Sequence, residues 1–66
     1  MRIVALETFE RGMPKANGGA LKMFKGESVF ATEVDGALVC DTPKRHRLEA
    51  PVVCQLFLAG LIRVVE

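Results

Sequence analysis

The chain closes with Pro51-Val-Val-Cys-Gln-Leu-Phe-Leu-Ala-Gly-Leu-Ile-Arg-Val-Val-Glu66, and this stretch decides the fold. Pro51 suits the first turn of a helix, where its missing N–H group would have no intrahelical partner in any case. Gly60 suits the left-handed position that follows a helix. We therefore predict a helix over 52–59 and a closing strand over 61–65.

The predicted helix lacks the polar face that a surface helix normally has. Gln55 is the only strongly polar residue from Val52 to Leu58. Such a helix is either enclosed in the core or covered by another molecule. Helical spacing puts Val53 and Phe57 on one face and points Leu58 furthest from it. We predict Val53, Phe57 and Leu58 as partner-binding residues, in a homo-oligomer or on a protein partner. The β-branched valines leave a strand over this segment as the alternative.

The rest of the chain reads as strands separated by turns. Asp35-Gly36 lies between two apolar runs and predicts a two-residue type I′ hairpin, which pairs Val34 with Ala37. Strands are predicted over 3–8, 20–24, 29–34 and 37–40, with long loops over 10–19 and 41–50.

These elements predict an α+β fold in one small domain, residues 1–66. It would have an antiparallel sheet of three to five strands and one short helix before the last strand. A long loop after the first strand and a helical turn before the last also resemble an SH3-like barrel.

Length and composition narrow the class of protein. A chain of 66 residues buries only about 60% of its unfolded surface, and a core of this size supplies only ~3–5 kcal/mol, so a partner chain would help to stabilise it. The net charge of +1 selects no class of partner. No run reaches the roughly 18 apolar residues of a membrane span. We expect no membrane association and a cytoplasmic location, in host cytoplasm or in a virion if the chain comes from a phage.

Cysteine and histidine are too sparse to predict a metal site or a catalytic site. Cys40, His46 and Cys54, with Asp41 as a fourth ligand, lack the close pair that structural zinc sites use. We interpret the cysteines as buried, reduced thiols and His46 as a solvated loop residue. A single histidine in so short a chain also argues against nucleophilic catalysis. We expect no cofactor, no metal and no enzymatic activity.

The basic run Lys44-Arg45-His46-Arg47 is the sharpest polar feature of the sequence. One interpretation is a nucleic-acid contact, because clustered cations neutralise backbone phosphates. Others are an electrostatic match to an acidic protein partner and a merely solvated loop. No aromatic residue lies in the run to stack on bases. The sequence therefore favours protein binding, with nucleic-acid binding through residues 44–47 as the alternative.

Three motifs together resemble a family of small tailed-phage proteins of accessory or structural role. They are the opening strand that ends at Phe9, the turn Lys25-Gly-Glu27, and the terminal Leu56-x-x-x-Gly-Leu-Ile62 with its closing strand. The chain differs from that pattern in its long segment 30–50. The resemblance implies a non-enzymatic binding role on a larger assembly, either as a virion-associated capsid protein or as a host-targeting protein.

Overall fold

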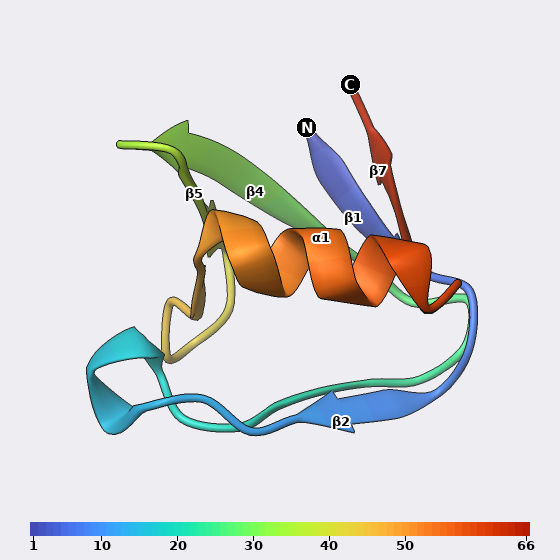
Figure 1. Ribbon diagram of the computed structural model, residues 1–66, viewed down its shortest axis with the longest axis horizontal. Coiled ribbons are helices and arrows are strands. Elements are labelled where there is room, and N and C mark those ends of the chain that lie inside the picture. The colour runs from blue at the N-terminus through green and yellow to red at the C-terminus, as the bar shows by residue number, and fades with distance from the viewer.

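Five antiparallel strands form a curled sheet in the order β6-β5-β4-β1-β7, and β2 and β3 form a separate ribbon. A computed structural model describes residues 1–66. The elements in chain order are β1 (Arg2–Ala5), β2 (Phe9–Arg11), the 3-10 turn η1 (Lys15–Asn17), β3 (Leu21–Met23), β4 (Ser28–Val34), β5 (Ala37–Cys40), β6 (Arg47–Leu48), α1 (Ala50–Leu58) and β7 (Ile62–Val65). Figure 1 shows α1 crossing in front of the curled sheet, with the β2–β3 side of the molecule below it.

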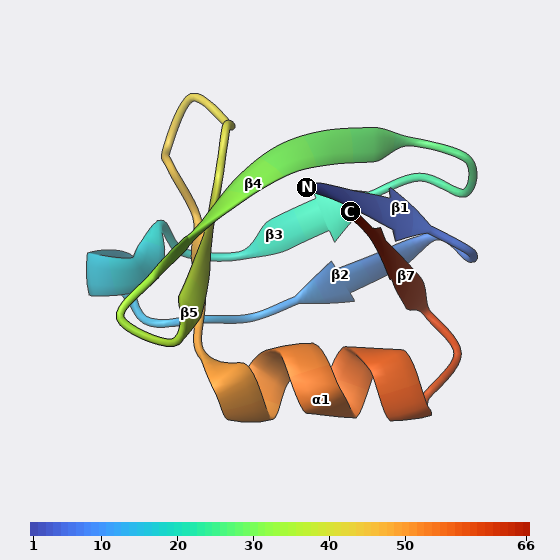
Figure 2. The ribbon, with the colours of Figure 1, turned by 90° about the horizontal axis from the view of Figure 1, so that it is seen from above.

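This architecture confirms the predicted α+β fold with one helix before the last strand. The excursion through β2 and β3 after β1, and the helix before β7, follow the order expected of an SH3-like barrel. The ladder itself stays open, because β6 and β7 are the two ends of the sheet and do not pair. The two chain termini lie together, since β1 pairs with β7 (Figure 2).

The predicted Asp35-Gly36 hairpin is confirmed in type and in register. Asp35 and Gly36 have φ angles of 50° and 82°, the positive values that a type I′ turn requires. Val34 pairs with Ala37, and the same register continues to the pair Ala31 and Cys40. The turn chemistry therefore fixes which side chains of β4 and β5 face the core.

The core joins the inner faces of both sheets to a single helix position. Its fully enclosed side chains include Ile3, Cys40, Leu48 and Ile62, and Leu56 is the only buried residue of α1. The remaining buried apolar residues are Ala5, Phe9, Leu21, Met23, Ala31 and Ala37. Val52 and Val53 pack against this core in part, whereas Phe57 and Leu58 remain exposed. The interpretation of an enclosed core helix is therefore wrong.

The helix begins and ends as its sequence indicates. Pro51 lies in the first turn, and the backbone oxygen of Glu49 accepts the first helical hydrogen bonds. At the other end, Gly60 has φ 73° and donates to the Phe57 oxygen, while the Leu61 N–H donates to the Leu56 oxygen. These two bonds form a Schellman motif, which satisfies the last carbonyl groups and turns the chain into β7. The alternative of a strand over this segment is wrong.

Two strands lie where the sequence predicts loops. Glu10 and Arg11 belong to β2, opposite Lys22 and Leu21 of β3. Arg47 and Leu48 form β6, which pairs with β5. Both strands are short, with three and two residues, and each has only one buried apolar side chain, so they carry almost no periodic signal. Their pairing with neighbours remote in sequence decides their conformation.

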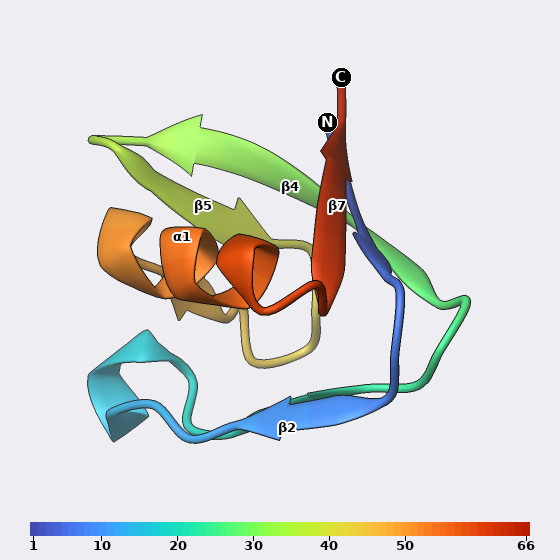
Figure 3. The same cartoon turned by 45° about the vertical axis from the view of Figure 1, so that its right-hand side comes forward.

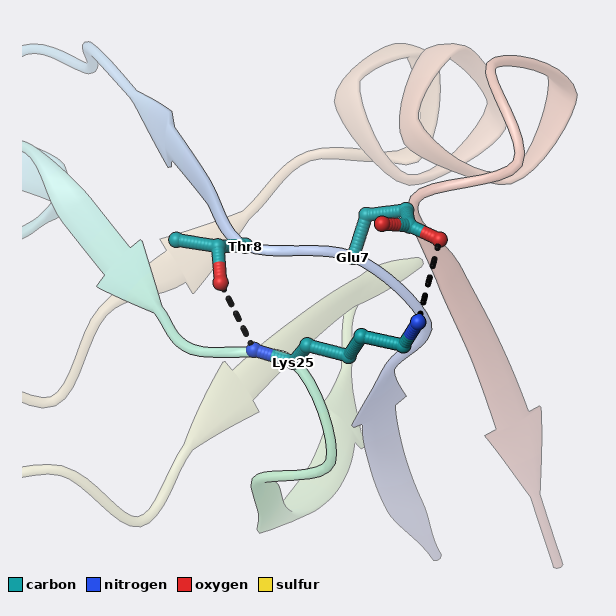
Figure 4. Close-up of polar contacts among 3 residues, drawn as sticks. All are labelled: Glu7, Thr8 and Lys25. Atoms are coloured by element: carbon teal, nitrogen blue, oxygen red, sulfur yellow. Dashed lines mark hydrogen bonds and ion pairs between the residues drawn. The ribbon is translucent and has the colours of Figure 1, made fainter.

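Polar contacts fix the corner where the chain leaves the main sheet. The first strand ends at Ala5, earlier than predicted, and the chain turns through residues 6–8 into β2. The Lys25 N–H donates to Thr8 Oγ1 at 3.0 Å, and Lys25 Nζ lies 3.8 Å from Glu7 Oε2 (Figure 4). These contacts join the corner after β1 to the turn before β4. They help to hold the β2–β3 ribbon at its angle to the sheet, which Figure 3 shows from the side.

Candidate functional site

An apolar groove of about 410 Å³ lies beside α1, and we call it the α1 groove. Helix residues, residues of the β4–β5 hairpin and residues near both termini line it. They are Met1, Glu33, Gly36, Leu38, Ala50, Val53, Cys54, Phe57 and Val64. Seven of these nine residues are hydrophobic, and Glu33 is the only one with a charged side chain. The groove is therefore suited to an apolar ligand surface.

The three residues predicted to bind a partner divide between two positions. Val53 and Phe57 line the α1 groove together, and the Phe57 side chain remains 58% exposed. Leu58 does not line the groove and is 77% exposed. Sequence reasoning missed Met1, Leu38 and Val64 as groove residues. The signal that could have found Val64 is the alternation along β7, where Ile62 is buried, Arg63 is exposed and Val64 is half-buried.

Two other phenylalanines are also exposed, but in different surroundings. Phe30 on β4 is 65% exposed and does not line the groove. Phe24 lies beneath the Lys22 ammonium, which is 5.2 Å from the ring centroid, a cation–π contact that partly occupies the ring face. Only Phe57 among the exposed aromatic residues lies in an apolar groove.

The two cysteines have opposite environments. Cys40 on β5 is fully buried, and this burial raises the pKa of its thiol from 9.0 to about 11. Cys54 is exposed on α1, so the prediction that both thiols are buried is wrong for Cys54. Its place on the helix face away from Leu56 explains the difference. Both thiols are free, so no disulfide joins β5 to α1.

His46 is buried rather than solvated, which corrects its predicted role as a loop cation. The side chain is 8% exposed, and both ring nitrogens have partners. Nε2 lies 3.0 Å from the Ala20 carbonyl oxygen, which can only accept, so Nε2 carries the proton. In the neutral ring, Nδ1 then accepts from the Thr42 hydroxyl at 2.7 Å. The Thr42 oxygen in turn accepts the His46 backbone N–H at 3.1 Å. The ring thus ties loop 41–46 to the loop before β3.

The basic run does not form one continuous cationic surface. Lys44 and Arg45 are exposed, whereas Arg47 is half-buried on β6 with its Nε 2.8 Å from Glu49 Oε1. With His46 buried, two of the four residues are used within the fold. Lys44 and Arg45 are therefore the two exposed cations of the run, and the contact predicted through residues 44–47 stays a prediction.

A second, polar hollow of about 450 Å³ lies between the two long loops, and we call it the lysine hollow. Lys15, Gly18, Gly19 and Lys44 line it, and none of them is hydrophobic. Sequence reasoning missed Lys15, because nothing in the local sequence shows that loop 14–20 reaches loop 41–46. Here two loops remote in sequence place two cations around one space.

No group of three or more histidine, cysteine, aspartate or glutamate residues lies close enough to hold a metal ion. Cys40 is enclosed in the core, Cys54 is on the helix surface, and the ring of His46 is fully hydrogen-bonded. The longest helix is α1, and no helix has both the length and the apolar character needed to cross a bilayer. Comparison of the chain with protein families, with curated proteins and with solved structures gives no match.

Proposed function

We propose that this chain is a small, non-enzymatic protein-binding module that docks on a larger assembly through the α1 groove. Val53 and Phe57 would form the centre of the contact, and Leu58 would extend it along the helix. The observation that carries the proposal is an exposed aromatic side chain in a groove lined mainly by hydrophobic residues.

The energetics of interfaces support this choice of surface. Aromatic residues that fill desolvated pockets supply much of the energy of protein association. The α1 sequence from Ala50 to Leu58 contains no charged residue, so a partner can cover it without desolvating an ion. In a chain this small, covering the groove would also add stability by mass action.

The class of assembly in this proposal comes from the sequence motifs. The resemblance to small tailed-phage proteins supports a virion or a host protein as the partner. The opening strand and the turn over 25–27 lie outside the groove lining, whereas Phe57 and Val64 of the terminal motif and its closing strand line the groove. Only the terminal motif would therefore take part in the contact.

Substitution of single phenylalanines tests the proposal. We expect Phe57→Ser to abolish partner capture by a tagged protein, as detected by chemical cross-linking and mass spectrometry in the source cells. Phe30→Ser is the matched control, because Phe30 is equally exposed but lies outside the groove. Equal loss in both variants, or no specific partner with a monomeric wild type in sedimentation, would contradict docking through the α1 groove.

A further inference from the structure

We propose that the lysine hollow is a binding site for phosphate-type anions. It lies apart from the α1 groove and shares no lining residue with it, so it would serve a second ligand.

The cations of the hollow have no partner in the fold. The two ion pairs of the molecule are Lys25 with Glu7 and Arg47 with Glu49, so neither Lys15 nor Lys44 is neutralised. No acidic residue lines the hollow. Two like charges that face one space repel each other, and an anion between them removes this repulsion.

Buried contacts hold the two loops in place before any ligand binds. His46 Nε2 donates to the Ala20 oxygen, and the Thr42 hydroxyl bonds to Nδ1. We call these contacts of His46 the loop lock, because they join the loop that carries Lys44 to the loop that carries Lys15. The Gly18 backbone packs directly on His46, and a Cβ atom at Gly18 would lie 3.0 Å from His46 Cα. Because the loops are already ordered, the ligand does not have to order them.

The chemistry of the lining selects the kind of ligand. No apolar or aromatic side chain is available for a base or an acyl chain. The N–H groups of Gly18 and Gly19 donate to the oxygens of Lys15 and Pro14, so the loop amides are also occupied. The charged residues that line the hollow are two lysines, and lysine binds phosphate as a point charge. Arg45, exposed next to Lys44, can extend the contact along a phosphate chain.

A titration with sodium pyrophosphate at constant ionic strength tests the site. We expect saturable shifts in the 1H–15N spectrum at residues 15, 18, 19 and 44. The double variant Lys15→Gln with Lys44→Gln should bind about tenfold more weakly, because each surface charge contributes modestly. Lys22→Gln is the control, since Lys22 is an exposed lysine on β3 outside the hollow. The absence of saturable shifts, or equal weakening in the control, would overturn the proposal.

A second titration separates free phosphates from the phosphates of a nucleic-acid strand. Single-stranded oligothymidylate and oligoadenylate are the probes, followed by fluorescence anisotropy. Tighter binding of both oligonucleotides than of pyrophosphate, with steep loss on adding salt and loss in the double variant, identifies a strand as the source. Binding no tighter than that of pyrophosphate identifies free phosphate anions. Strong dependence on the base, or oligonucleotide binding that survives in the double variant, would contradict recognition by these two lysines.

Discussion

The loop side of the molecule, around His46, and the helix side, around α1, present different surfaces. On the loop side, His46 is buried with both ring nitrogens bonded, and the hollow between the loops is lined by two lysines and two glycines. On the helix side, Leu56 is the only buried position of α1, and the exposed residues include the large apolar side chains of Phe57 and Leu58. On the loop side the buried polar groups have hydrogen-bond partners within the fold, and the surface carries charge. On the helix side large apolar side chains lack cover within the fold and are open to a partner.

The cysteines provide the largest expected contrast between a core position and the helix surface. At mildly alkaline pH, iodoacetamide should modify Cys54 in the native protein at least a thousandfold faster than Cys40, a ratio equivalent to ~4 kcal/mol. Cys40 is enclosed, and its pKa of about 11 leaves almost no thiolate. Mass spectrometry should show one adduct on native wild type and none on Cys54→Ser.

The raised pKa of Cys40 also predicts that the free energy of unfolding falls at alkaline pH. The Cys40 thiol ionises at 9.0 in the unfolded chain and at about 11 in the fold, so stability is unaffected below the lower value and falls between the two. The environments assigned to the two cysteines would be wrong if both thiols reacted at one rate, or if bound zinc protected them.

Gly18 tests how tightly the loop side is built. We expect Gly18→Ala to lower the free energy of unfolding by about 3 kcal/mol, because strain at φ 98° adds to overlap with His46 Cα and Cδ2. Gly19→Ala is the control, with φ 74° and no atom within 4 Å of the added Cβ, and should cost only about 1 kcal/mol. Chemical denaturation gives both values. If the two variants were equally stable, the contact between Gly18 and His46 would not be part of the loop lock.

Sequence reasoning could predict the features whose cause is local. Asp35-Gly36 determines its turn through backbone preference alone, and Pro51 and Gly60 set the ends of the helix in the same way. The alternation of Ile62, Arg63 and Val64 is a local signal of the same kind, because these residues are buried, exposed and half-buried in turn. Each of these signals lies within a few residues of the structure that it specifies.

The features that could not be predicted depend on contacts between remote segments. His46 is surrounded by Lys44, Arg45 and Arg47, a context typical of exposed residues, yet its burial depends on the Ala20 carbonyl, 26 positions earlier in the chain. Lys15 reaches the lysine hollow by the same long-range approach. The uniform apolarity of α1 shows that its surface needs cover, but which residues the sheet leaves open depends on tertiary packing.

Thr42 tests the hydrogen bonds of the loop lock without changing its shape. Thr42→Val should destabilise the fold by about 2 kcal/mol, since it removes both the donor to Nδ1 and the acceptor of the His46 N–H inside a buried site. Thr32→Val on the exposed face of β4 is the matched control and should change stability by less than about 0.5 kcal/mol. Thermal unfolding compares the two. Equal stability would show that the ring is held by packing instead of by these bonds.

Substitution of Leu58 has the smallest expected effect on stability and tests most directly whether the helix side binds a partner. The side chain is 77% exposed, so Leu58→Glu should change the free energy of unfolding by less than about 0.5 kcal/mol. A carboxylate in a dry interface has no counter-charge, so the same variant should lose association with a partner or with a second copy. Gln55→Glu is the control, because it places the same charge on an exposed position of α1 that is already polar. Circular dichroism measures folding, and sedimentation or cross-linking measures association. Unfolding of the Leu58 variant would assign this residue to the internal core. Association that survives in it would restrict the interface to the α1 groove around Phe57.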